Sequence, residues 1–553
     1  MQVKSNRLKV SVALVLGLLL AFAPSAEAGR KISNTVPQLG LWFKENSELT
    51  SMSSVIYGKA KADSTDSYDW KICGELSSKV CTDAEEIMII HSLPICSASA
   101  DFNCISGTWA ISPTGERIDG VAVKRMAAKG NGDFSAVPSM GLSEGNGTGT
   151  IFKYPGVLNS GGKDTYLVTV RSMYNFKKKA GDAAFTNDYS IRNFRAGVLP
   201  VEEFTGNYVP VHVTDGYGSD AGLGKAPDGT DCQSSDYGLC EAIRDFPDGY
   251  QFGLKIRSTK KLTGWFHGRI HQPIIETIAN GDGQDISIQA LPVKVTALDY
   301  LAPISEYSQA AKDAIFSDRE WGVTGDPARG IKIVAGLDQQ EARDVFKLFN
   351  SAFKDTSSYE HTYWSVSALG YFNENDSIQR CSDQSGNLAG IVTTNSLLYS
   401  AGPPTFNKES DSLDYQLASP HFESNGKETV GSYDLLIRAD VARCIYGFSK
   451  APVSASISIV SSDGDAKVAT TVLGEKDGWL FVSAQGFGFS SPTVRVKFTQ
   501  EAPVVVTPSP TASPTVVPAP AVAPKRTIAC VKGKTIKKVT GTKPICPKGY
   551  KKA

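Results

Sequence analysis

One segment of the chain has the residue pattern of a catalytic serine. Gly141-Leu142-Ser143-Glu144-Gly145 matches G-x-S-x-G, in which a strand-to-helix turn exposes a nucleophilic hydroxyl. That turn needs a strand before the serine and a helix after it. Here Pro138 precedes the motif and a glycine-rich run, 146–149, follows it. Both flanks therefore predict loop, and we interpret the motif as a loop without catalytic function.

His267 and His271 are four residues apart, which is the spacing of a metal-binding pair on a helix. Their segment contains Gly268 and ends at Pro273, which argues against a helix. In a strand the two rings would be ~13 Å apart, too far for one ion. A strand would place four polar or aromatic side chains on one face: Trp265, His267, Arg269 and His271. These four side chains could form a strip that binds sugars or anions. Alternatively, they form a partly buried face whose polar groups are satisfied internally, and we favour this second interpretation.

A glycine-rich loop before Cys232 carries four aspartates: Asp215, Asp220, Asp228 and Asp231. Carboxylate oxygens in such a loop suit calcium, but the spacing fits no calcium-loop template, and Asp-Gly clusters are typical of turns. We therefore expect no cofactor, with a structural Ca²⁺ ion as the alternative. Paired carboxylates of a glycosidase cannot be assigned from sequence, because their separation decides their role.

Ten cysteines form an even set, which in an exported chain predicts a framework of disulfides. Three pairs each enclose seven residues, and two further pairs are wider. The candidate pairs are Cys73 with Cys81, Cys96 with Cys104, Cys232 with Cys240, Cys381 with Cys444, and Cys530 with Cys546. Spacing alone does not fix connectivity, so crossed pairings stay open.

The N-terminus has the features of a secretory signal peptide. Basic residues precede an apolar run, 10–23, which is followed by Ala26-Glu27-Ala28. The run is shorter than the ~20 residues that a membrane-spanning helix needs. We therefore expect cleavage before Gly29, a secreted protein, and no transmembrane helix in the mature chain.

Charge is distributed unevenly along a chain whose formal net charge is zero. Residues 525–553 contain ten Lys or Arg and no acidic residue, and the signal segment 1–28 carries a net charge of +2, which leaves −12 on residues 29–524. Between body and tail, residues 501–524 contain seven prolines and favour an extended spacer. This contrast in charge between an acidic body and a cationic tail indicates what the protein binds rather than how it folds.

The tail also resembles a known type of module. Residues 530–552 read CVKGKTxKKVTGxKPxCPxGYKK, which resembles short basic two-cysteine C-terminal modules that recur on secreted actinobacterial proteins. The runs GWFHGR at 264–269 and RCIYGF at 443–448 are similar to an uncharacterised family of exported proteins of that group. The resemblance implies location and architecture, and no activity.

Short runs of alternating hydrophobicity predict a mainly β fold, built as several antiparallel β-sandwich domains with a small helical insert. Four such runs lie between Val453 and Thr499, separated by turn residues such as Asp477-Gly478. Glu341 follows Asp338 in capping-box spacing, and an apolar stripe then predicts a helix over 338–354. The expected divisions are a signal peptide 1–28, β domains at 29–205, 206–355 and 356–500, a linker 501–524, and a disulfide-closed tail 525–553.

These features favour a non-enzymatic protein at the cell surface, although the sequence leaves enzymatic activity open. The β-rich body would bind or adhere, while the tail associates with anionic cell-wall polymers or glycans. A secreted polysaccharide hydrolase that the tail retains at the wall is the alternative. The acidic body argues against a specific nucleic-acid partner.

Overall fold

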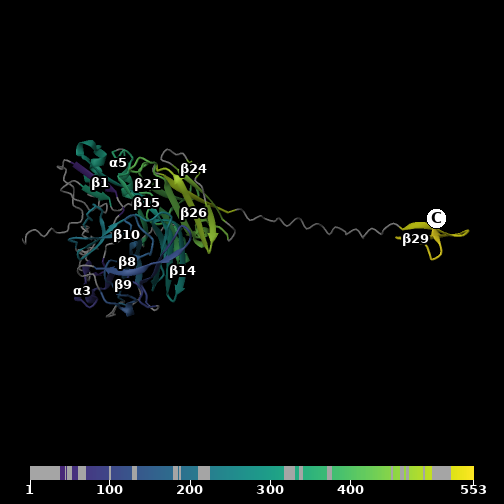
Figure 1. Cartoon of the computed structure of the whole chain (residues 1–553), viewed down its shortest axis with the longest axis horizontal. Coiled ribbons are helices and arrows are strands. Elements are labelled where there is room, and N and C mark those ends of the chain that lie inside the picture. Colours follow the sequence, from purple (N-terminus) through teal and green to yellow (C-terminus); the bar gives the residue numbers. More distant parts are fainter. Residues whose placement is uncertain are drawn as a thin grey trace, which may run out of the picture. The chain divides into compact units, whose positions relative to one another are not determined.

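The computed structural model describes most of the body and the whole tail. The described residues are 38–43, 45, 53–59, 70–98, 101–127, 134–178, 185, 189–208, 224–316, 331–334, 340–350, 352–369, 377–449, 453–460, 466–468, 472–489, 492–500 and 525–553. The predicted signal peptide 1–28 and linker 501–524 lie outside them. Contacts divide the chain into two compact units, Met1–Gln500 and Glu501–Ala553. The fold is mainly β, as the sequence predicts (Figure 1).

One long series of paired strands, here called the central sheet, organises the first unit. Neighbouring strands in it are antiparallel except for β14 and β18, which are parallel. In spatial order its strands are β3 (Trp70–Ile72), β2 (Val55–Lys59), β4 (Glu86–Ser92), β9 (Thr165–Lys177), β10 (Tyr189–Thr205), β17 (Tyr359–Leu369), β14 (Gly264–Asn280), β18 (Leu388–Thr394), β22 (Gly431–Arg438), β26 (Trp479–Phe487) and β25 (Val472–Lys476).

Two further sheets flank the central one. The second sheet contains β6 (Arg117–Asp119), β5 (Cys104–Ile111), β13 (Gln251–Ser258), β15 (Gly283–Pro303) and the distal half of β14. The third sheet contains β24 (Ala466–Val468), β23 (Ser454–Val460), β27 (Thr493–Thr499), β21 (Ser412–Ala418), β19 (Leu398–Tyr399) and β20 (Thr405–Asn407). Because β14 belongs to two sheets, it joins them covalently.

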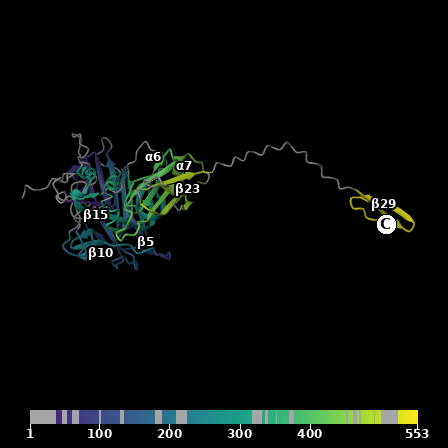
Figure 2. The same cartoon turned by 90° about the horizontal axis from the view of Figure 1, so that it is seen from above.

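Shorter elements complete the body. The remaining strands are β1 (Gln38–Phe43), β7 (Val121–Met126), β8 (Gly149–Lys153), β11 (Cys232–Asp236), β12 (Leu239–Ile243) and β16 (Ile331–Val334). The helices are α3 (Lys79–Asp83), α4 (Gln309–Phe316), α5 (Gln340–Phe349), α6 (Ser377–Ser385) and α7 (Ala439–Tyr446), with 3₁₀ turns η1 (Pro138–Met140) and η2 (Ile304–Glu306). Figure 2 shows α6 and α7 in the green part of the chain, near β23.

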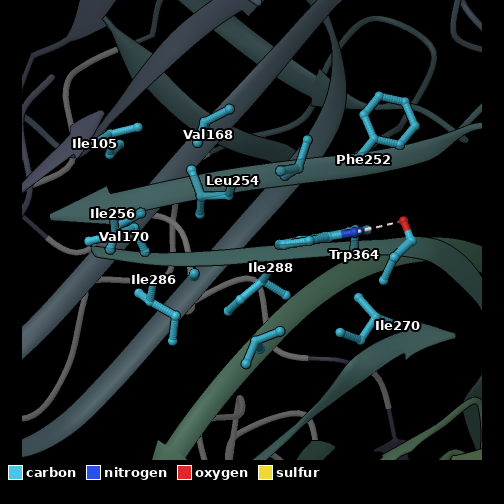
Figure 3. Close-up of a cluster of buried hydrophobic side chains, with 14 of the residues drawn as sticks. Ile105, Val168, Val170, Phe252, Leu254, Ile256, Ile270, Ile286, Ile288 and Trp364 are labelled. Carbon is cyan, nitrogen blue, oxygen red and sulfur yellow. Dashed lines mark hydrogen bonds between the residues drawn. The ribbon is translucent and has the colours of Figure 1, made fainter. Parts of the chain in front are cut away.

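A large apolar core lies between the central and second sheets (Figure 3). Val168, Val170 and Trp364 enter it from the central sheet, while Leu254 and Ile288 enter from the second. The Trp364 indole donates to the carbonyl of Ala290 at 3.1 Å, so its one polar group is also satisfied. This core buries one face of the central sheet.

The opposite face of the central sheet is buried over β14, β18, β22 and β26. A second core there joins these strands to the third sheet and to the buried faces of α6 and α7. Trp265 and Leu435 enter it from the central sheet, and Tyr415 and Val496 from the third. Strands in this part of the central sheet are therefore enclosed on both faces.

Several local predictions are confirmed. The helix expected over 338–354 is α5, Gln340–Phe349, whose Val345 and Phe346 are buried. The Asp477-Gly478 turn joins β25 to β26 with φ of 53° and 80°, the left-handed pair that a two-residue hairpin requires. Of the four runs between Val453 and Thr499, three form β23, β26 and β27, whereas the run expected over 467–473 is shared between β24 of the third sheet and β25 of the central sheet.

The divisions expected within residues 29–500 stay predictions. Strands pair across both proposed limits: β10 with β17, and β5 with β13. A limit at residue 205 or 355 would therefore have to separate strands that share hydrogen bonds.

All ten cysteines form disulfides, in the five pairings that the sequence offered as candidates. Four bridges close local loops, whereas Cys381–Cys444 spans 63 positions and joins α6 to α7. Among the described residues, none of the helices has the length and apolarity that a membrane crossing needs.

The second unit is a small antiparallel sheet. It consists of β28 (Arg526–Lys532) with β29 (Thr535–Gly541) on one side and β30 (Lys551–Lys552) on the other. Cys530 is fully buried and bonds to Cys546, so the disulfide takes the place of an apolar core.

We predict that removing the Cys381–Cys444 bridge destabilises the body more than removing a local bridge. The chain-entropy estimate is about 4 kcal/mol for this loop and about 2–3 kcal/mol for a loop of nine residues. The double variant C381A/C444A should therefore unfold at a lower urea concentration than the matched control C96A/C104A. Equal midpoints would show that loop length does not govern the effect here.

Candidate functional site

Three of the four side chains expected on a binding strip lie inside the protein. Trp265, His267 and Arg269 are 1%, 4% and 0% exposed, because the first half of β14 runs where both faces of the central sheet are covered. The Trp265 indole donates to the Ser382 hydroxyl at 2.8 Å. These three side chains are therefore buried, but burial alone does not show that all their polar groups are satisfied internally.

Arg269 has a nearly complete set of internal partners. Its guanidinium donates to Glu45 at 2.8 Å and to the carbonyls of Ser396 and Leu397, and it stacks 4.3 Å from the ring of Tyr399. Burial acts to lower the pKa of Arg269, but the Glu45 carboxylate outweighs it, so the pKa is raised and the charge persists. Arg269 is thus one half of a buried ion pair.

His267 is only half satisfied. Its Nδ1 lies 2.9 Å from the Tyr399 hydroxyl, whereas its Nε2 is buried without a hydrogen-bond partner. Burial, together with the charges of Arg195 and Arg269, lowers the pKa of His267 to about 3. The imidazole is therefore neutral at physiological pH.

His271 does not continue the strip, because the strand is interrupted after it. A β-bulge between His271 and Ile274 places Gln272 at a φ of 51°. Asp434 accepts from the Nδ1 of His271 and from the backbone N–H of Gln272, each at 2.7 Å. Gln485 donates to the Nε2 of His271 at 3.0 Å. The carboxylate therefore fixes both the bulge and the orientation of the ring.

The aspartate loop is described only in part. Asp215 and Asp220 lie outside the described residues, so the calcium site stays a prediction. Asp228 forms an ion pair with Arg244 at 2.6 Å, and Asp231 one with Lys225 at 2.7 Å. The Thr230 hydroxyl and backbone, with Arg244, lower the pKa of Asp228. Within the described part of the chain, no group of three or more His, Cys, Asp or Glu has the geometry to hold a metal.

The G-x-S-x-G segment is a loop, as expected, but it contacts a histidine that the sequence did not reveal. The hydroxyl of Ser143 lies 3.4 Å from the Nε2 of His91, which comes from β4. That nitrogen donates to the Glu144 carbonyl at 3.0 Å, and Ser143 donates to the Asn103 carbonyl at 2.7 Å. The imidazole thus cannot accept the serine proton in this arrangement, and its Nδ1 has no carboxylate partner.

Strand register reveals a set of residues that sequence reasoning missed. Arg171 on β9 lies directly opposite Arg195 on β10, which lies opposite Ser367 on β17, which lies opposite His267 on β14. We call these four residues the basic row. Directly opposite residues share a face of the sheet, so the row lies on the face of Trp265 and Arg269. The available signal was an arginine, Arg171 or Arg195, next to apolar residues in each of two predicted strand segments.

The tail presents a different kind of site. All ten of its basic side chains are exposed, and residues 525–553 contain no acidic residue to neutralise them. Lys537 and Lys552 lie on either side of Cys530 across the three strands. Ile536 and Ile545 are 68% and 81% exposed, so apolar contacts accompany the charges. The disulfide holds this surface in one arrangement.

Comparison of the chain with family models, curated proteins and solved structures finds no match. The function must therefore be argued from the chemistry of the buried cluster around β14 and of the exposed tail.

We predict that E45Q destabilises the body strongly, because it leaves the Arg269 charge buried without its partner. Breaking such a pair costs about 3–5 kcal/mol, whereas removing both charges costs less. In urea denaturation, E45Q/R269M should be at least about 1 kcal/mol more stable than the sum of the two single effects implies. D119N is the control, since it breaks the exposed Arg117–Asp119 pair and should barely move the midpoint. Additive single effects would contradict the coupling.

We also predict that His91 makes the body sensitive to acid. Burial lowers the pKa of His91 from 6.5 to about 4, so below pH 6.5 the unfolded chain binds a proton that the folded chain excludes. The stability contributed by the neutral ring is complete above pH 6.5 and is lost as the pH falls toward 4. H91Q should reduce the difference in unfolding free energy between pH 7.5 and pH 5 by about 2 kcal/mol. S143A, which keeps the imidazole, should retain the wild-type pH dependence; a response of S143A equal to that of H91Q would refute the assignment.

Proposed function

We propose that this protein is secreted and works at a cell surface as a non-enzymatic binding or adhesive protein. Its cationic tail associates with anionic wall polymers, and its β-rich body, built of antiparallel sandwich domains, makes the outward contact. The observation that carries the proposal is the tail: ten exposed basic side chains, no acidic residue, and a disulfide that fixes them.

Other features support the same conclusion. The signal-like N-terminus and five disulfides fit an oxidising extracellular environment. The proline-rich residues 501–524 suit a spacer between a retained tail and a working body. The resemblance of residues 530–552 to C-terminal modules of secreted actinobacterial proteins points the same way.

The physical basis of retention is electrostatic. A regular polyanion offers closely spaced charges, and several lysines on one small sheet contact it at once. Each lysine close to an anionic surface contributes about 1 kcal/mol, so ten weak contacts make a useful anchor. Because the charges are exposed, salt screens them; the Debye length falls from ~14 Å at about 50 mM salt to ~3 Å at 1 M.

We predict that the chain from Gly29 to Ala553 sediments with isolated cell walls at low salt and is released at high salt. K537Q/K538Q/K551Q/K552Q should weaken retention at least about tenfold, since four contacts are lost. The matched control replaces the same four lysines with arginine, which keeps the charge and should keep retention. Retention is measured as the protein fraction in the pellet across a salt series.

Equal retention of the glutamine and arginine variants would refute the role of the tail. Sugar released from the walls is measured in the same tubes. Release that persists in both variants would instead identify the body as a polysaccharide hydrolase.

A further inference from the structure

The basic row places two arginines side by side in the middle of the central sheet. Arg171 and Arg195 are directly opposite each other on neighbouring strands. Like charges in this position repel, and the energetic cost grows as the groups are removed from water. Glu45, a carboxylate on the same side of β14, is committed to Arg269. An anion held against the row would offset this repulsion.

Two groups of the row have unused hydrogen-bonding capacity. The Nε of Arg195 and the Nε2 of His267 are both buried without a partner. Among the described residues, no carboxylate forms an ion pair with Arg195. Buried polar groups are normally satisfied, so two orphans on one row indicate a missing partner that accepts hydrogen bonds.

The residues between and beside these groups are small. Ser367 separates Arg195 from His267, while Ser365 and Gly197 occupy the next row toward Arg269. The short side chains of Ser365 and Ser367 add two hydroxyl donors beside the buried Nε of Arg195 and Nε2 of His267. Arg195 and Ser365 are partly exposed, so the row can be reached from solvent.

The ring of His267 can also be set to donate. When the Tyr399 hydroxyl donates to Nδ1, at 2.9 Å, the hydrogen of the neutral imidazole resides on Nε2. That hydrogen then belongs to the same face as the Arg195 guanidinium. Guanidinium, imidazole N–H and serine hydroxyls together are the donors that proteins use for tetrahedral oxyanions.

We propose that the basic row is a binding site for a small tetrahedral oxyanion, a phosphate or sulfate group. Arg195 and His267 Nε2 hold the anion, and Ser365 and Ser367 supply further hydrogen bonds. The site is separate from the tail, so it does not depend on the function proposed above. Because His267 is 4% exposed, the site admits a free ion or the terminal group of a small ester and excludes an internal phosphodiester of a polymer.

The test is calorimetric titration of the chain from Gly29 to Ala553 with inorganic phosphate, inorganic sulfate and glycerol 1-phosphate, at about 150 mM NaCl to screen exposed charges. We expect one anion bound per chain, and the relative affinities distinguish a free ion from an ester. R195M, which keeps the shape and removes the charge, should weaken binding at least about tenfold, since hydrogen bonds to charged groups are strong. R117M is the matched control, because Arg117 is exposed and belongs to another strand, and it should bind as the parent chain does.

Two further variants distinguish binding at the basic row from binding elsewhere on the chain. S367L keeps every charge but puts a bulky side chain between Arg195 and His267, and it should abolish binding. The tail variant K537Q/K538Q/K551Q/K552Q should bind unchanged; loss of binding there would place the anion on the tail and overturn the proposal. Equal binding by R195M and R117M would overturn it as well.

A measurement on the unaltered chain tests the proposal even if some of the variants fail to fold. The chain has six histidines, so their imidazole signals can be followed by NMR during phosphate titration. We expect the His267 imidazole to shift with saturation at the calorimetric affinity, while the imidazole of His91, also buried, keeps its chemical shift. Phosphate that moves no buried histidine signal would show that the basic row takes no anion.

Discussion

Enclosure of β14 and the neighbouring strands β18, β22 and β26 on both faces is the constraint on which the rest of the body depends. A sheet with one wet face can carry polar side chains on that face at little cost, whereas an enclosed strand must satisfy each of them internally. β14 contains a tryptophan, two histidines and an arginine, and each one recruits partners from distant sequence: Ser382, Tyr399, Glu45 and Asp434. These contacts tie α6, β19, the segment after β1 and β22 to one strand. Polar chemistry thereby fixes the order of elements that apolar packing alone would leave interchangeable.

The disulfides stabilise the fold by a different means, which is covalent cross-linking. Three of them close loops of equal length next to strands, and two of these, Cys73–Cys81 and Cys232–Cys240, belong to small apolar clusters. The Cys381–Cys444 bridge instead joins two helices that cover the second core. In the tail the Cys530–Cys546 bridge replaces apolar packing as the main source of stability, because three short strands cannot bury a core of useful size.

Local features of this fold could be predicted from sequence, and non-local ones could not. The α5 stripe and the Asp477-Gly478 hairpin depend on residues a short distance apart, whereas the even set of cysteines predicted disulfides but left their connectivity open. Alternation in 265–271 correctly placed Trp265, His267 and Arg269 on one face but could not show that this face is covered. The covering comes from α6 and the third sheet, which follow β14 by about a hundred residues or more in the sequence. The bulge that removes His271 from the face is held by Asp434, which is distant in the sequence. The contact of Ser143 with His91 likewise could be predicted only if the order of the strands were known. The basic row likewise exists only once four strands are in register.

The two charged regions of the chain follow opposite physical regimes. Tail lysines are hydrated and mobile at their tips, so each contributes little, contributions add, and salt weakens all of them together. The groups around β14 are few and desolvated, so each interaction is strong, depends on geometry, and is almost insensitive to salt. A surface of exposed, hydrated charges like the tail suits a repetitive polymer that is bound without recognition of its shape. A site of the second kind suits a small ligand of fixed shape. The two proposed interactions therefore differ in their dependence on ionic strength, which is the variable that separates them in an experiment.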